Sequence, residues 1–310
     1  MALHQASGRW RLGLLLALVT ASCWATLPVA LKITLEQLDP ITLTWFRFVV
    51  ATVVLLAWLG ARGGLGAFRT LDGKRWGWLV IAALMLIGNY VFYLLGVEHT
   101  TPGNAQLLIQ LAPLLMALGG IFIFREPYRL GQWCGLLIIA AGLLLFFRDQ
   151  LHDGPEASHE YLLGSGFVIF AALVWAIYAL LQKQLLQHLG SPAILLFIYV
   201  AASIVLLPMS HPAALLALDA KHWLTLAYCA INTLIAYGAF AEALEHWEAS
   251  RVSTVFATTP LLTLGFIALV HGFSPGLIHS EHITTLGYVG AVLVVVGSGL
   301  SSLLGNRKSA

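Results

Sequence analysis

The same pattern of apolar stretches and polar residues occurs twice along this chain. Trp24 and Lys32 in the first copy recur as Trp175 and Lys183, at the same spacing. Two further sets match in spacing: Tyr90, Tyr93 and Pro113 with Tyr237, Phe240 and Pro260, and Glu126, Gly135 and Gly142 with Glu281, Gly290 and Gly297. Each copy holds five apolar stretches, and because five is odd, the second copy would cross a membrane upside down relative to the first. Two inverted halves that meet at the bilayer midplane are typical of alternating-access transporters.

Composition places the chain in a membrane. Hydrophobic residues make up 59% of it and charged residues only 10%, whereas a soluble domain has roughly 25% charged residues. So few charges cannot cover a surface that faces water. The net charge of +2 is small and says nothing about nucleic acid, and no nucleic-acid partner is expected. The three cysteines lie far apart within apolar stretches, which favours core packing over a disulfide.

Ten stretches are suited to membrane helices, since a span needs about 20 mostly apolar residues. A helix satisfies its own backbone hydrogen bonds in hydrocarbon, and these stretches lack the alternation of barrel strands. They are Leu12–Leu31, Pro40–Leu59, Trp78–Leu95, Pro102–Phe124, Gly131–Phe147, Leu162–Leu181, Pro192–Leu207, Trp223–Ala243, Ser253–Val270 and Ile283–Leu303. We therefore predict an all-α integral membrane protein with ten transmembrane helices. They form two inverted five-helix repeats at residues 12–147 and 162–303, joined by a periplasmic linker at residues 148–161.

Basic residues indicate which loops face the cytoplasm. Arg9 and Arg11 precede a leucine run as in a signal peptide, but the apolar stretch continues to Leu31, which favours an uncleaved first helix. With the N-terminus in the cytoplasm, twelve Lys and Arg residues of the loops and helix ends fall inside and three outside. The three outside are Lys32, Arg148 and Lys221. The positive-inside rule thus predicts a multi-pass protein of a bacterial inner membrane with both termini cytoplasmic.

Ionisable residues in the spans are the first candidates for function, because each costs at least ~2.5 kcal/mol at the bilayer centre. Arg47 lies about two turns from the outer end of the second span. It can snorkel upward, anchor a helix contact or face a cavity, with a carbonyl, a tyrosine or a substrate carboxylate as its partner. Glu242, near the cytoplasmic end of the eighth span, is a candidate for proton coupling, although the glutamates that follow it also fit a solvated helix end. Lys32 and Lys183 end matched spans, so they are gating candidates as well as interfacial anchors.

Uncharged polar residues are more numerous inside the spans, and they predict the lining of a substrate cavity. Trp24 and Trp175 lie mid-span, away from the interface where tryptophan usually collects, and each indole N–H needs a partner. Gln106 and Gln110 lie one turn apart and would share a face of the fourth span. The other candidates are Asn89, Tyr90 and Tyr93 in the third span, Tyr178 in the sixth, Tyr199 in the seventh, and Asn232 and Tyr237 in the eighth. Interhelical hydrogen bonding without a cavity is the alternative interpretation.

Matched prolines and glycines predict how the helices bend and pack. Pro113 and Pro260 each remove a backbone N–H from a span, which predicts matched kinks that act as a hinge or a cavity wall. The fifth and tenth spans carry glycines that allow close helix contact, either as a peripheral support or as the face of a homodimer. These are Gly131, Gly135 and Gly142, and Gly287, Gly290, Gly297 and Gly299.

The loop before the tenth span is eight residues longer than its counterpart in the first repeat. It holds three histidines and one glutamate: His271, His279, Glu281 and His282. Such residues can bind a metal or sense pH. The sequence gives no ligand spacing that specifies a metal, so we predict a solvated loop and no metal site.

Taken in order, these features resemble the EamA-type family of the drug/metabolite transporter superfamily over nearly the whole chain. The first copy carries Trp24…Lys32, Asp39-Pro40…Arg47, Tyr90…Tyr93 ahead of Thr100-Thr101-Pro102-Gly103-Asn104-Ala105, Leu111-Ala112-Pro113, Arg125-Glu126 and Gly135…Gly142. The second carries Trp175…Lys183, Ser191-Pro192, Glu248-Ala249-Ser250-Arg251-Val252, Thr259-Pro260 and Glu281…Gly290…Gly297. The resemblance implies an inner-membrane carrier with a central cavity for amino acids, other metabolites, sugars or drugs, often moved outward. The chain departs from the family pattern in its enlarged last loop and in Tyr199, which stands where the first copy has Arg47.

The main functional prediction is a secondary transporter, and an exporter of a small amino-acid-like or amphipathic metabolite fits best. Its partners would be that solute and the lipid bilayer, with coupling to protons and a homodimer as open alternatives. A membrane sensor or scaffold that has lost transport is the second hypothesis. An enzyme is not expected, because the spans hold no aspartate and the chain has no HExxH or nucleophile-elbow motif. No cofactor is expected either.

Overall fold

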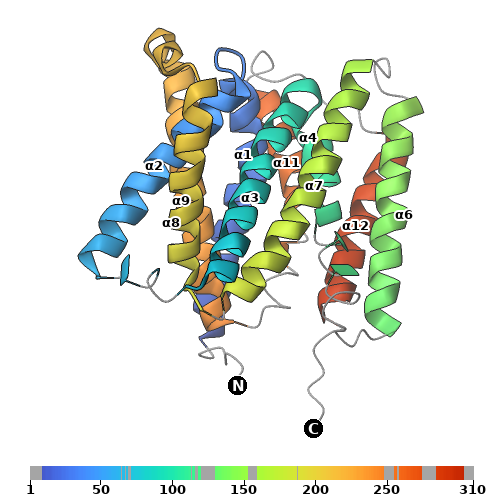
Figure 1. The fold of residues 1–310 in the computed structure, drawn as a ribbon. Helices are drawn as coiled ribbons and strands as arrows, with labels where there is room; N and C mark the ends of the chain where they lie inside the picture. Colours follow the sequence, from blue (N-terminus) through green and yellow to red (C-terminus); the bar gives the residue numbers. More distant parts are fainter. Residues whose placement is uncertain are drawn as a thin grey trace.

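A computed structural model gives the fold (Figure 1). It describes residues 9–63, 65–66, 68, 71–112, 114–115, 118–119, 130–152, 159–186, 188–247, 255–256, 258–273 and 284–303. Within these residues the regular secondary structure is entirely helical, with no strand. The predicted all-α class is therefore confirmed for this part of the chain.

A helix overlaps each predicted span. The first half contains α1 (Trp10–Thr34), α2 (Pro40–Ala61), α3 (Gly73–His99), α4 (Pro102–Leu108) and α6 (Leu130–His152). The second half contains α7 (His159–Leu185), α8 (Ser191–Leu206), α9 (Ala220–His246), α11 (Thr259–Phe273) and α12 (Thr285–Leu303), with short 3-10 helices η2 (Leu207–Met209) and η3 (Pro212–Ala217) between α8 and α9.

Length and composition single out six of the described helices as able to cross a membrane. These are α1, α2, α3, α7, α8 continued by η2, and α9, while α6, α11 and α12 contain apolar segments of 10–17 residues. Large apolar side chains are exposed along the helices, among them Leu144 at 70% and Ile204 at 66%. Such surfaces suit lipid rather than water. Ten complete crossings stay a prediction.

Local sequence signals explain where several helices begin. Asp39 precedes α2 and its carboxylate accepts hydrogen bonds from the N–H groups of Ile41 and Thr42, while Pro40 occupies the first turn. Thr101 caps α4 in the same way, ahead of Pro102. A capping side chain satisfies an N–H that the helix leaves unpaired, and proline needs no such partner.

The main helix pairs stay the same when the two halves are exchanged. α1 packs on α9, and its counterpart α7 packs on α3, the counterpart of α9. α2 packs on its own counterpart α8, α4 on α11, and α6 on α12. Figure 1 shows α1 and α7 running in opposite directions, and α1 begins on the side where α12 ends. These features fit two inverted repeats. We call the side that holds the α1–α2 connection the outer end.

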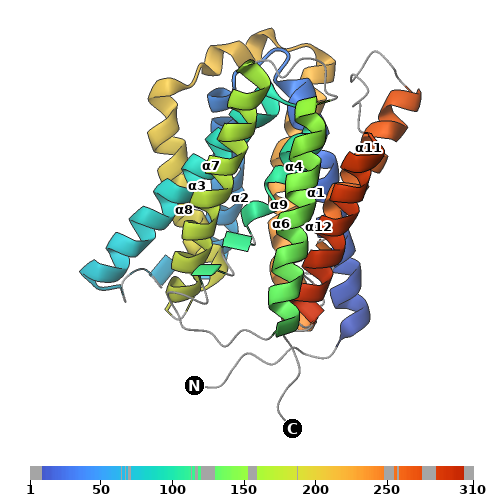
Figure 2. The same cartoon turned by 90° about the vertical axis from the view of Figure 1, so that its right-hand side faces the viewer.

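Glycines bring α6 and α12 into backbone contact at the edge of the bundle (Figures 1 and 2). A Cβ atom added to Gly142 would lie 2.6 Å from the carbonyl oxygen of Gly290, and one added to Gly297 would lie 2.7 Å from that of Gly135. The predicted close contact is therefore confirmed. It forms within one chain, so this glycine face is not free to serve as a homodimer interface.

The fourth and ninth spans differ from the continuous helices that we expected. α4 ends at Leu108, and a turn at Ile109 and Gln110 precedes further helical residues. The N–H of Ala112 bonds to the carbonyl of Ile109, because Pro113 has no N–H to offer that oxygen. In the second half, the N–H of Thr258 bonds to the carbonyl of Val255, and α11 begins only at Thr259.

Candidate functional site

Arg47 is a buried cation at the meeting point of α2, α3 and α9. Its side chain is enclosed, with the residue only 2% exposed, so it does not snorkel to the surface. Nε and Nη2 donate to Thr233 Oγ1 at 3.1 and 3.0 Å, and the guanidinium lies 5.0 Å from the centre of the Tyr90 ring. Within the described residues, no carboxylate forms an ion pair with it.

Aromatic side chains surround this cation. Phe48 stacks on Tyr199 from α8 with ring centres 5.4 Å apart, and contacts Tyr90 at 4.7 Å. The hydroxyls of Tyr199 and Tyr237 lie near that of Tyr90. The Tyr199 hydroxyl is buried and has no partner at hydrogen-bonding geometry. We call Arg47, Phe48, Tyr90, Tyr199 and Thr233 the Arg47 cluster.

Trp24 and Trp175 lie beside further aromatic rings. Trp24 contacts Tyr237, Phe240 and Phe256 at centre distances of 6.1, 5.9 and 5.1 Å. Trp175 contacts Tyr178 at 6.5 Å. Both tryptophans are half-buried, and neither indole N–H has a hydrogen-bond partner within the described part of the chain.

Four of the predicted polar residues form hydrogen bonds between helices. Asn89 donates to the backbone carbonyl of Ala171 at 2.9 Å, which joins α3 to α7. Asn232 donates to the carbonyl of Cys23 at 2.8 Å, which joins α9 to α1. The Tyr93 hydroxyl donates to Gln106 Oε1 at 3.2 Å. These contacts match the alternative interpretation of interhelical bonding, because each of these amides already has a protein partner.

Gln110 and Tyr178 differ in their surroundings. Gln110 lies in the turn after α4, so it does not share a helix face with Gln106 as we expected. It is half-buried. Tyr178 is buried in the core that also contains Tyr90 and Tyr199. The tyrosines of the third, sixth and seventh spans thus come together.

Lys32 closes the end of a neighbouring helix. Its Nζ donates to the carbonyls of Val97, Glu98 and Thr100, at 2.8, 2.5 and 2.8 Å. The last carbonyls of a helix have no partner within it, so a lysine beside them is stabilising. This supports anchoring for Lys32. The side chain of its counterpart Lys183 lies outside the described residues.

The remaining coupling and gating candidates lie away from the Arg47 cluster. Glu242 is exposed near the inner end of α9, where its carboxylate lies 3.3 Å from Nε2 of His246. Pro260 lies in the first turn of α11 and therefore does not kink that helix. Pro113 lies outside the described residues, as does the histidine loop apart from His271.

Thr233 is a residue of the Arg47 cluster that sequence reasoning missed. It lies four residues before Tyr237 on α9, so both share one helix face. The four-residue spacing from Tyr237, a predicted site residue, was the sequence signal that could have identified Thr233. A threonine in an apolar span rarely stands out, because its hydroxyl can bond the carbonyl of the preceding turn, as Thr233 also does with Cys229.

Comparisons with known proteins agree with the repeated architecture. The model of the EamA-like transporter family matches residues 11–148 and 162–303. The "Uncharacterized inner membrane transporter YhbE" of Escherichia coli K12 is 36% identical, over 96% of this chain and 92% of its own length. The "Probable amino-acid metabolite efflux pump" of the same organism is 24% identical, over 91% of this chain and 92% of its own. A crystal structure of a protein 20% identical to this one has a TM-score of 0.66 and covers 96% of this chain and all of its own, so the fold is shared.

Proposed function

The chain belongs to the EamA-like transporter family and is a membrane transporter, and we propose that it exports a small amphipathic metabolite with a carboxylate group across the inner membrane. An amino acid or a derivative of one fits this description. The solute would pass between the two halves as they rock about a site at the midplane, in the manner of carriers built from inverted repeats.

The buried charge of Arg47 is the observation that carries the proposal. A guanidinium has five N–H donors, and Thr233 accepts from only two of its nitrogens. A buried charge is costly unless it is paired. A carboxylate binds a guanidinium through strong charge-assisted hydrogen bonds. Since the described residues offer no carboxylate, the substrate is the source we propose.

The neighbours of Arg47 support an amphipathic solute. Phe48, Tyr90 and Tyr199 give apolar surface directly beside the cation. Trp24 and Trp175 add two indole N–H groups without protein partners in the described residues. A binding site of this kind is mostly apolar with a few placed polar groups that fix orientation.

The direction and class of cargo are supported by one relative. The efflux pump from Escherichia coli is described as acting on amino-acid metabolites, and it aligns over 91% of this chain. The matched helix pairing supports alternating access, because exchanging the halves leaves the main helix pairs in place. Neither observation names the solute.

The cargo can be found by comparing the medium of cells that overexpress the protein, cells that lack it, and cells that express Arg47→Met. A carboxylate metabolite should accumulate outside only with the intact protein. Flux of that metabolite from proteoliposomes should fall roughly tenfold or more in Arg47→Met, as expected for the loss of charged hydrogen bonds. The abundance of the variant in the membrane should be unchanged.

Arg62→Met is the matched control. Arg62 also lies over an aromatic ring, that of Trp58 at 4.6 Å, but it is exposed at the end of α2. Its loss should leave flux intact. Normal flux in Arg47→Met would remove the arginine from the site, and the absence of any exported solute would favour the sensor or scaffold.

A further inference from the structure

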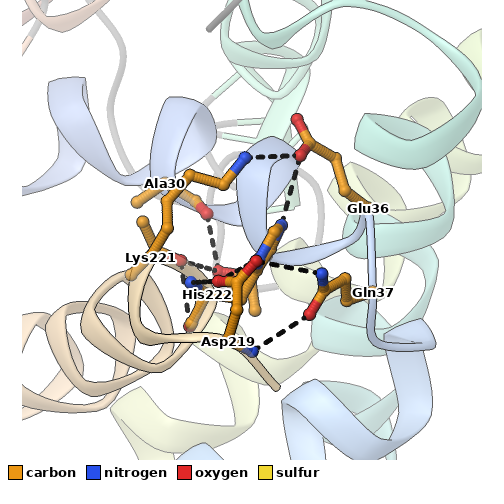
Figure 3. A network of polar contacts seen from close by, with 8 residues as sticks. Ala30, Glu36, Gln37, Asp219, Lys221 and His222 are labelled. Carbon is orange, nitrogen blue, oxygen red and sulfur yellow. Dashed lines mark hydrogen bonds and ion pairs between the residues drawn. The ribbon is translucent and has the colours of Figure 1, made fainter. Parts of the chain in front are cut away.

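A network of charged residues joins the two halves at the outer end (Figure 3). Glu36 and Gln37 belong to the α1–α2 connection in the first half. Asp219, Lys221 and His222 lie at the start of α9 in the second half. Figure 3 shows His222 between the carboxylates of Asp219 and Glu36.

His222 faces a carboxylate at each ring nitrogen. Nδ1 lies 2.7 Å from Asp219 Oδ1, and Nε2 lies 3.2 Å from Glu36 Oε2. The histidine is only 3% exposed, so water does not replace these partners freely. The other contacts tie the same two segments: Lys221 bonds Glu36 at 2.8 Å, and Gln37 bonds Asp219 at 3.1 Å.

The number of protons on His222 decides how many of these contacts are hydrogen bonds. A neutral imidazole donates from one nitrogen and presents a lone pair at the other. One carboxylate oxygen would then face that lone pair and be repelled. Only the imidazolium donates to Asp219 and Glu36 together. The contact of Nδ1 with Asp219, in the same half, is the shorter one, at 2.7 Å, so the single proton of the neutral ring belongs there, and protonation of Nε2 adds the bond to Glu36 in the other half.

Other charged groups lie around the network. Glu36, Lys32 and Glu98 line a cavity of about 190 Å³ together with Leu35. Asp39, at the start of α2, lies 3.5 Å from Nδ1 of the exposed His211. Partial burial raises the pKa of Glu36, but hydrogen bonds from Lys221 and His222 outweigh this and hold it below its usual value. The backbone N–H of His222, followed by its ring, lowers the pKa of Asp219.

We propose that Glu36, Asp219, Lys221 and His222 form a latch that holds the outer end closed, and that protonation of His222 tightens it. The proposal rests on the proposed function, in which the halves separate at one end to release the solute. Because the latch joins the α1–α2 connection to α9, it spans both halves. Acidification of the outer medium therefore retards opening at that end.

The pH dependence has a definite sign. The bond from Nε2 of His222 to Glu36 is present while the ring is an imidazolium and is lost when the ring gives up its second proton as pH rises. The carboxylates contribute above their lowered pKa values and lose their charge only as pH falls through them. The latch is thus tightest in mildly acidic medium, between these two limits.

Hydrogen exchange of the full chain in lipid nanodiscs tests the latch without a solute. The N–H of Asp219 donates to Gln37 Oε1 at 3.3 Å, so its protection reports the docked state. At pH 6, this amide should exchange roughly tenfold faster in His222→Gln than in the unmodified protein, as for the loss of one hydrogen bond. At pH 8, the two proteins should exchange at similar rates.

Two further variants keep the test decisive. Glu36→Gln changes a half-exposed side chain and should also accelerate exchange at pH 6. His211→Gln removes a histidine that pairs with a carboxylate at the same end, and it should have no effect. Equal exchange at pH 6, or a difference of the same size at both pH values, would overturn the latch and leave the transport proposal standing.

Discussion

Replacing Gly142 with alanine tests the backbone contact between α6 and α12. The new Cβ would lie 2.6 Å from the carbonyl oxygen of Gly290 and 2.8 Å from the backbone nitrogen of Val294. Ordinary van der Waals contact begins at 3.4 Å. Because both atoms belong to the backbone, no side chain can rotate away, and the helices must separate. Overpacking of this kind costs about 1–3 kcal/mol.

Thermal unfolding of the purified protein in detergent measures this cost. We expect Gly142→Ala to lower the midpoint by several degrees. Gly238→Ala is the control, because a Cβ at Gly238 in α9 has nothing within 4 Å. The double variant Gly142→Ala with Gly290→Ala should cost less than the two single changes together, since the first already moves the helices apart. If Gly142→Ala is as stable as Gly238→Ala, the close contact does not hold the pair together.

Two other changes have expected outcomes. Lys32→Met removes three hydrogen bonds to the end of α3 and should cost about 1.5–3 kcal/mol of stability in thermal unfolding. The control Lys74→Met changes an exposed lysine over Trp78 and should cost nothing measurable. Equal stability of the two variants would show that Lys32 does not anchor the end of α3. Trp24→Leu and Trp175→Leu should alter which solutes are exported, as measured by competition in the flux assay, and should leave the abundance of the protein in the membrane unchanged. An unchanged solute preference would mean that both side chains serve only in packing.

The sequence predicted the helices because their positions depend on coarse features. Apolar length places a span, and Asp39-Pro40 or Thr101-Pro102 marks its first turn. The repeated glycines predicted close helix contact by the fifth and tenth spans, since only glycine lets two backbones approach so closely, but they did not show that α6 and α12 contact each other. Spacing alone could not show that the turn at Gln110 interrupts the fourth span. The position of this turn depends on which N–H groups bond the carbonyls just before Pro113.

The candidate site was predictable in its residue types but less so in its contacts. Arg47 stood out because a charge in a span is rare, and the structure places it beside Tyr90, one of the partner types expected. Thr233 and His222 did not stand out, since their roles come from residues that are about 186 positions away in the sequence. Glu242 was expected near the cytoplasmic end of the eighth span, either as a proton-coupling residue or at a solvated helix end, and it is exposed there. Its exposure depends on which side of α9 faces outward, which composition does not fix.

The two halves share helix crossings but not charges, and this difference bears on direction. Asn89 in α3 bonds the carbonyl of Ala171 in α7, and at the matched crossing Thr20 in α1 bonds that of Ala236 in α9, so the donor comes from the opposite helix. The crossing is thus repeated although its residues are not. Arg47, in contrast, has only Tyr199 as its counterpart. In a symmetric carrier the outward-facing and inward-facing states would have equal energy, because exchanging the halves converts one into the other. Under the proposed alternating-access mechanism, a single buried cation removes that equality, and the empty carrier would have a preferred state.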